Sequence, residues 1–222
     1  MIERPLFEWE WIAENLDVIW EKGLEHVWLT VLAVAIGLAI ALPLGILAHR
    51  KRWLYPPIGG AAGVLYTVPS LALLAMLLPW TGLSITTAAI ALVSYTQFIL
   101  IRNIVTGLDG VPEDAKEAAR GMGYTRRQLL WSVELRLATP AIMAGLRIAT
   151  VSTIGLVTIT TLIGLGGFGS IFFQLGFRRF NNTAMITGAV LSVALALAAD
   201  ALLLVAQKVL APWSRRRRAV GV

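Results

Sequence analysis

An uninterrupted apolar run, LTVLAVAIGLAIALPLGILA at 29–48, constrains what this chain can fold into more than any other feature. It carries no charged residue, and a helix of about 20 such residues crosses the hydrocarbon core of a bilayer. The segment before it is acidic and rich in tryptophan, whereas a secretory signal peptide would have a basic segment there and a small-residue cleavage site after the run. We therefore expect the run to remain in the protein as a membrane span.

Four further apolar stretches follow, at 58–79, 84–107, 139–163 and 184–210. The composition agrees with an integral membrane protein, since 57% of the residues are hydrophobic and only 14% are charged. Pro43 and Pro69 lie inside the first and second spans, where neighbouring helices can satisfy the backbone groups that a proline frees. The sequence predicts an all-α membrane protein with five transmembrane helices.

The basic residues are divided unevenly between the two sides of these predicted helices. Of the 19 Lys and Arg residues, all but four fall on the side that holds the chain's C-terminus. The four on the other side are Arg4, Lys22, Arg178 and Arg179. Because loops on the cytoplasmic side carry the excess of Lys and Arg, we expect the N-terminus outside and the C-terminus inside. The net charge of +6 thus reflects membrane orientation, and no nucleic-acid partner is predicted.

The sequence lacks the residue patterns that catalytic and metal-binding sites require. The chain has no cysteine, which excludes disulfides, iron–sulfur clusters and thiolate zinc sites. Its two histidines, His26 and His49, are predicted at opposite membrane faces, and neither H-E-x-x-H nor G-x-S-x-G occurs. We predict no catalytic residue, no metal site and no cofactor.

The segment GLGGFG at 164–169 matches the dinucleotide-binding pattern G-x-G-x-x-G. No strand precedes it, and a chain of five helical spans leaves no place for a βαβ unit. We interpret it as a flexible turn at the outer face, leading to an outward segment in which Arg178 and Arg179 offer charge contacts to a partner.

A charged insert, PEDAKEAARGMGYTRRQLLWSVELRLATP at 112–140, separates the third and fourth predicted spans. Pro112 suits the first position of a helix, because its φ is fixed and its missing N–H would have no partner there. Glu113 and Asp114 favour the positive end of a helix. A short helix is therefore expected to begin at Pro112.

An elbow and a second helix are predicted next. Gly121 and Gly123 offer a left-handed stop for the first helix. Thr125 and Gln128 form a capping-box pattern that starts the second. Thr139 is expected to cap the fourth span. The insert is thus predicted to be two short helices joined at a glycine elbow on the cytoplasmic face.

Within this insert, EAARGMG at 117–123 followed by VELRLATP at 133–140 resembles the EAA loop of bacterial ATP-binding-cassette importer permeases. In that loop a short helix docks into a cleft of the ATPase subunit. The resemblance implies that this contact is made by Glu117, Ala118, Ala119, Gly121 and Gly123. Arg136 stands where many members have proline, so Pro140 is expected to supply the local helix break. The alternative is a solvated linker.

Three more segments resemble permeases of the osmoprotectant group, which carries glycine betaine, carnitine and choline. They are HVWLTVLAVAIGLAIALPLGIL, TVPSLALLAMLLPWTG and PAIMAGLRIATVSTIGLVTITTLIGLGGFG, and the resemblance covers 26–210. It implies an extracytoplasmic segment at 1–25, a permease domain at 26–211 with its coupling loop at 109–138, and a basic cytoplasmic tail at 212–222. Permeases for methionine or another amino-acid-like solute are the alternative, and an intramembrane enzyme or a passive channel would be a different class.

The same resemblance implies the partners. They are ABC ATPase subunits, an extracytoplasmic solute-binding protein, and a second permease copy in a homodimer or a sister-permease heterodimer. The chain has no Walker A sequence, so ATP hydrolysis is assigned to the separate ATPase. The expected location is the bacterial cytoplasmic membrane. Transport is expected to occur by alternating access driven by ATP.

Charges inside the predicted spans suggest contacts between helices. Arg147 and Asp200 fall at similar depths from the cytoplasmic edge, so an ion pair is predicted, with a gating role or substrate contact as alternatives. Arg102 is expected to snorkel to lipid phosphate or to reach Asp109.

Small and basic residues suggest further contacts. Gly37, Ala41 and Gly45 recur every four residues and predict a face for close helix packing, or alternatively for dimerisation. Arginines at 215–218 are expected to anchor the tail at anionic lipid, or to sense ionic strength.

Overall fold

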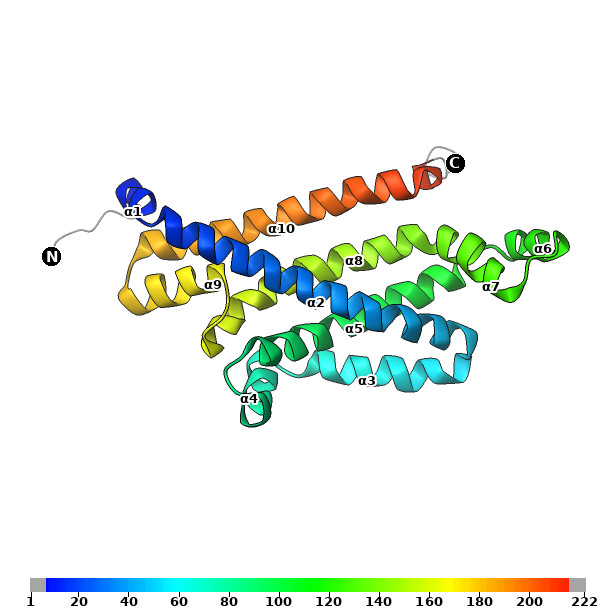
Figure 1. Cartoon of the computed structure of the whole chain (residues 1–222), viewed down its shortest axis with the longest axis horizontal. Coiled ribbons are helices and arrows are strands. Elements are labelled where there is room, and N and C mark those ends of the chain that lie inside the picture. Colours follow the sequence, from blue (N-terminus) through cyan, green and yellow to red (C-terminus); the bar gives the residue numbers. More distant parts are fainter. Residues whose placement is uncertain (1–6, 216–222) are drawn as a thin grey trace.

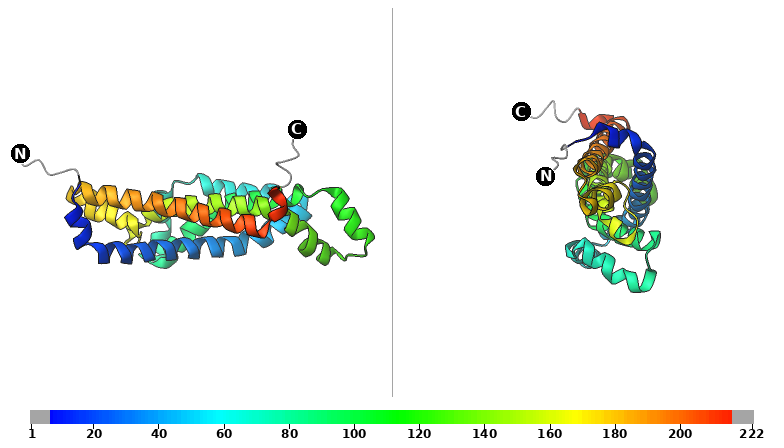
Figure 2. Two further views of the ribbon diagram at one scale, coloured as in Figure 1. Left: turned by 90° about the horizontal axis from the view of Figure 1, so that it is seen from above. Right: turned by 90° about the vertical axis from the view of Figure 1, so that its left-hand side faces the viewer.

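The structure is a computed structural model that describes residues 7–215, and that part of the chain is helical, without a strand. The helices are α1 (Trp9–Glu14), α2 (Leu16–Arg50), α3 (Tyr55–Thr67), α4 (Ser70–Thr81), α5 (Ile85–Asp109), α6 (Glu113–Gly121), α7 (Arg126–Leu129), α8 (Leu135–Val157), α9 (Phe168–Ser170) and α10 (Asn182–Leu210). They form an elongated bundle, with α1 and α9 near one end and α6 and α7 beyond the other (Figures 1 and 2).

All five apolar stretches lie in helices of the bundle. Four continuous helices are long and apolar enough to span a membrane, namely Leu16–Arg50, Ile85–Asp109, Arg126–Ile163 and Asn182–Leu210. A bent pair, Arg52–Thr67 and Ser70–Thr81, makes a fifth if it is counted as one span. The helix of the first span begins at Leu16, well before the apolar run at 29–48, because most of the acidic, tryptophan-containing segment before the run is also helical.

The second span is broken, contrary to the expectation that it passes through Pro69. Its two halves, α3 and α4, meet at an angle of 97°. Val68 and Pro69 have extended backbones, with ψ of 128° and 133°. Proline disfavours a helical conformation in the residue before it, which here is Val68. The Tyr95 hydroxyl donates a hydrogen bond to the Val68 carbonyl, which the break leaves without a helical partner. Pro43, by contrast, lies within the continuous helix α2.

The start of the fourth span was also predicted wrongly. α7, a π-helical turn at Leu130–Glu134 and α8 run on continuously, so Thr139 and Pro140 lie inside a helix. The Thr139 hydroxyl donates to the Leu135 carbonyl over 2.9 Å instead of capping a helix end. The predicted helix break at Pro140 is absent, and the irregularity lies in the π-helical turn.

Helix α5 forms the centre of the bundle, with α2 and α8 packed against it through small residues. A Cβ atom added at Gly37 would lie 2.1 Å from Thr96 Oγ1, and one at Gly45 would lie 2.6 Å from Ile104 Cγ2. On α8, a Cβ at Gly145 would lie 2.4 Å from the Cβ of Asn103. The predicted packing face of α2 is therefore confirmed, and α5 of the same chain occupies it.

We expect Gly37→Val to lower the free energy of unfolding by about 1–3 kcal/mol, because the new side chain would push α2 away from Thr96. Ala39→Val is the matched control, since Ala39 is exposed on the same helix. Thermal unfolding of the purified protein in detergent checks this. Equal melting temperatures for the two variants would contradict the packing argument.

Candidate functional site

The polar insert forms a compact projection at one end of the bundle, built on helix α6 (Figure 2). The helix begins at Glu113, one residue after the proline that was expected to open it. Arg120 Nη1 donates to Glu113 over 2.8 Å, and Lys116 Nζ lies 3.3 Å from the same carboxylate. Hydrogen bonds from Arg120 and then Lys116 lower the pKa of Glu113. These contacts tie one turn of α6 to the next.

The elbow after α6 depends on a single glycine. Gly123 has a φ of +82°, whereas Gly121 is the last residue of the helix and does not adopt the predicted left-handed conformation. The N–H of Tyr124 donates to the Ala119 carbonyl over 3.1 Å, which closes the helix end. Thr125 and Gln128 then form the predicted capping box, which is confirmed.

The predicted coupling residues differ in exposure. Ala119 is buried, while Glu117, Ala118, Gly121 and Gly123 are exposed. Met122 and Tyr124 are exposed beside them, with 69% and 39% of their surface accessible. We call the exposed set of Glu117, Ala118, Gly121, Met122, Gly123 and Tyr124 the tip surface. Sequence reasoning missed Met122 and Tyr124, although two apolar side chains flanking the elbow glycine were a visible signal.

The base of the projection is fastened to two membrane helices. Asp109, at the end of α5, accepts a hydrogen bond from Arg52 Nη1 over 2.8 Å and lies 2.5 Å from His49 Nδ1. Arg50 Nη2 donates to the Arg126 carbonyl at the start of α7, over 3.4 Å. Arg102, which was expected either to snorkel to lipid phosphate or to reach Asp109, does not pair with Asp109. Arg102 is exposed on α5 and makes no ion pair within residues 7–215.

At the opposite end, a buried histidine joins three segments. His26 is fully buried, and its Nδ1 accepts a hydrogen bond from the Phe168 N–H over 3.2 Å. Its Nε2 therefore carries the proton and donates to the Ile154 carbonyl over 3.0 Å. This arrangement links α2 to α8 and α9. Sequence reasoning weighed His26 only for a hydrolytic or metal site, which it rejected, and its burial could not be inferred from its neighbours in the sequence.

The glycine-rich turn at 164–167 is packed, contrary to the expectation of a flexible turn. Glu25 accepts a hydrogen bond from the Gly166 N–H over 3.0 Å. Gly167 has a φ of +48°, and a Cβ atom there would lie 2.5 Å from the Cβ of His26. We call these contacts of Glu25 and His26 with the turn the histidine clamp. Arg178 and Arg179 lie nearby in the chain, in an exposed turn before α10.

One ion pair joins two membrane helices. Arg147 Nε donates to Asp200 Oδ1 over 2.8 Å, and Arg147 Nη2 donates to Asp200 Oδ2 over 2.7 Å. The predicted contact is therefore present, in the bidentate geometry that arginine and carboxylate favour. Of the predicted tail at 212–222, the structure describes only the short helical turn Pro212–Arg215, and the arginines at 216–218 fall outside the described residues.

The fold and these contacts define a polytopic membrane subunit with a structured projection at one end and no cluster of metal-ligating side chains within residues 7–215. Residues 33–216 match the family described as "binding-protein-dependent transport system inner membrane component", so the chain belongs to that family. It is thus an inner-membrane permease component of an ABC importer.

Individual relatives cover almost the whole chain. It is 36% identical to the osmoprotectant import permease protein OsmW of Salmonella typhimurium, over 91% of this chain and 96% of the relative. It is also 36% identical to the choline transport system permease protein OpuBB of Bacillus subtilis, over 94% and 95%. Among solved structures, an inward-facing MetNI methionine ABC transporter aligns with a TM-score of 0.81 at 23% identity, covering 89% of this chain and 98% of that chain.

We expect His26→Ala to loosen the histidine clamp, because it leaves the Phe168 N–H and the Ile154 carbonyl without partners. An unsatisfied buried group costs about 1–3 kcal/mol. Limited proteolysis at 164–167 and thermal unfolding in detergent check this. His49→Ala, at the other end of α2, is the control and should leave cleavage at the turn unchanged. Equal cleavage of both variants would count against the clamp.

Proposed function

We propose that this permease carries quaternary-amine osmoprotectants such as glycine betaine, carnitine and choline. The observation that carries the proposal is the 36% identity, over more than nine-tenths of the chain, to relatives named for osmoprotectant and choline import. A third relative, OpuCB of Bacillus subtilis, is named for glycine betaine, carnitine and choline and is 34% identical over 88% of this chain. The similarity to the methionine transporter, at 23% identity, supports a shared fold and gives no information on the solute.

The proposed orientation places the projection in the cytoplasm and the histidine clamp on the outer side. It is supported by the excess of Lys and Arg in the loops and helix ends that lie on the same side of the spans as the projection. The described ends of the chain also lie at opposite ends of the bundle, as an odd number of spans requires (Figure 1). Residues 26–211 then form the permease domain, between an outer segment at 1–25 and an inner tail at 212–222.

The tip surface is proposed to dock on a separate ABC ATPase subunit. Within residues 7–215, Glu117 makes no ion pair, so it is available to a basic group on the ATPase. Met122 and Tyr124 add apolar area of the kind that anchors protein interfaces. Gly123, with its φ of +82°, turns the backbone between Met122 and Tyr124, so these two exposed residues lie on either side of the turn.

Movement of the docked tip would reach the bundle through one helix. The continuous helix Arg126–Ile163 begins at the projection and ends at the glycine-rich turn. With 38 residues it is about 57 Å long at 1.5 Å per residue. Closure of two ATPase subunits would thus tilt this helix as a lever and switch the bundle between inward-open and outward-open states. A second permease copy, identical or a sister chain, completes the proposed transporter.

Uptake of radiolabelled glycine betaine by cells carrying the complete transporter tests this function. We expect Glu117→Arg to abolish ATP-dependent uptake and to reduce co-purification of the ATPase, because it reverses the charge at the tip. Glu14→Arg is the matched control, since Glu14 is exposed at the opposite end of the molecule. Normal uptake and ATPase binding by Glu117→Arg would refute the docking role. Uptake of methionine in place of glycine betaine would refute the proposed substrate.

A solute-binding protein is proposed to dock on the outer face near Arg178 and Arg179. We expect the double change Arg178→Glu and Arg179→Glu to weaken its binding and to reduce the dependence of the association rate on salt, because charges at an interface steer encounter. Binding to the reconstituted transporter at low and high salt measures both effects. Unchanged affinity and salt dependence would exclude these two residues from the contact.

A further inference from the structure

A groove on the side of the bundle contains both residues of the Arg147–Asp200 ion pair in its wall. It encloses about 480 Å³ between α8 and α10. Its walls are formed by Ala144, Arg147, Ile148, Val151, Ser152, Ala196, Leu197 and Asp200. We call it the charged groove. It is open to the outside of this chain, so whatever faces it must accommodate two full charges.

The ion pair is not hidden by the bundle. The side chains of Arg147 and Asp200 keep 26% and 35% of their surface exposed. Arg147 uses Nε and Nη2 for its partner, and Nη1 has no hydrogen-bond partner within the described residues. The pair therefore keeps a free donor and free carboxylate lone pairs directed away from its internal contact.

The depth of the pair makes hydrocarbon a costly neighbour for its two charges. Asp200 lies about 15 Å along α10 from the helix end at Leu210, and Arg147 lies midway along α8. Charged side chains within spans face a bundle interior or a water-filled cavity, because hydrocarbon cannot solvate them. In this chain alone the pair lies on an exposed face, so water or another protein surface must complete its surroundings.

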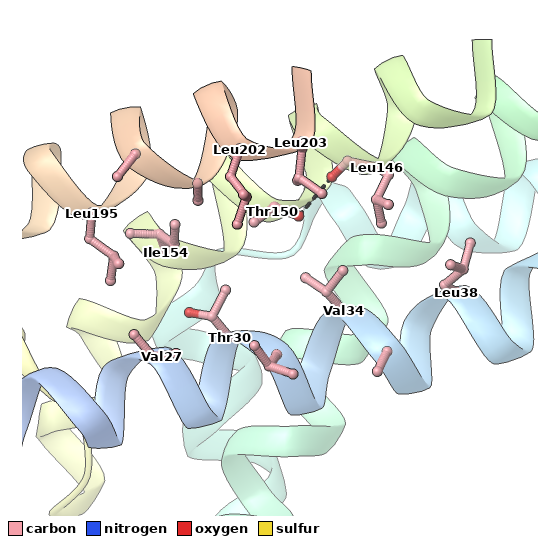
Figure 3. Close-up of a pocket in the computed structure, with 14 residues that line it drawn as sticks. Val27, Thr30, Val34, Leu38, Leu146, Thr150, Ile154, Leu195, Leu202 and Leu203 are labelled. Atoms are coloured by element: carbon pink, nitrogen blue, oxygen red, sulfur yellow. Dashed lines mark hydrogen bonds between the residues drawn. The ribbon is translucent and has the colours of Figure 1, made fainter. Parts of the chain in front are cut away.

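A second groove of similar volume, between α2, α8 and α10, provides the contrast (Figure 3). Its walls carry no charged residue, and the hydroxyls of Thr30 and Thr150 donate to carbonyls of their own helices, His26 and Leu146. Such a surface can lie against acyl chains without leaving a polar group unpaired. In the charged groove, Ser152 makes no hydrogen bond within residues 7–215, so its hydroxyl also lacks a partner from this part of the chain.

We propose that the charged groove is a water-filled part of the transport path and that its ion pair contacts the solute. Arg147 would bind the carboxylate of a zwitterion such as glycine betaine through its free Nη1, while Asp200 attracts the quaternary ammonium. A zwitterion lying antiparallel to the pair satisfies both charges at once. The proposal rests on the proposed function for the identity of the solute, but the presence of water in the groove does not depend on it.

Thiol labelling tests whether the groove holds water. Because the native chain has no cysteine, a single introduced cysteine reports on one position. We expect Ser152→Cys, in the complete transporter in membrane vesicles, to react with a cationic, membrane-impermeant methanethiosulfonate, and saturating glycine betaine to slow the reaction. Val31→Cys, in the apolar groove, is the control and should not react. If Ser152→Cys reacts no faster than Val31→Cys, the groove is covered by lipid or protein and the proposal fails.

A charge-neutral pair tests the contact with solute. The double variant Arg147→Gln and Asp200→Asn keeps two side-chain amides that can bond to each other but removes both charges. We expect the KM for glycine betaine uptake to rise about tenfold or more, with permease abundance and ATPase binding unchanged. An unchanged KM would show a purely structural pair. If the wild type carries no glycine betaine, the proposed substrate fails, whereas the labelling result still decides whether water fills the groove.

Discussion

The structure depends on the close approach of α2 and α8 to the central helix α5. In a membrane, lipid tails are as apolar as the side chains, so helices associate through dense packing instead of the hydrophobic effect. Gly37 and Gly45 on α2, and Gly145 on α8, allow that density because any side chain there would collide with α5. Once these three helices are fixed, both ends of the bundle acquire defined positions.

Each end is then organised by a few polar contacts. Asp109 ties the ends of α2 and α5 together under the projection, and His26 holds the glycine-rich turn against α2 and α8. The helix Arg126–Ile163 runs between these two ends without a break. This helix therefore connects the two ends of the bundle. By contrast, α10 packs against α8 and, near its start, against the turn at Ile171–Gly176, while its most apolar stretch is not buried.

Sequence reasoning located the membrane helices, the capping box at Thr125 and the contact between Arg147 and Asp200, because each depends on local composition or on depth along a helix. It failed where tertiary context decides. Pro43 lies within a continuous helix, whereas Pro69 breaks its span. The break at Pro69 is tolerated because the Tyr95 hydroxyl donates a hydrogen bond to the Val68 carbonyl. The clamp at His26 was also invisible, because its partners lie 128 and 142 residues away in the chain.

The π-helical turn at Leu130–Glu134 has a consequence for how the projection meets its partner. A π turn holds about one residue more than an α turn, and one residue corresponds to about 100° of rotation around a helix. The turn stands between the projection and the membrane portion of the helix. The orientation of the tip surface about the helix axis therefore depends on one additional residue. A relative that lacks this residue would present the same side chains in another direction.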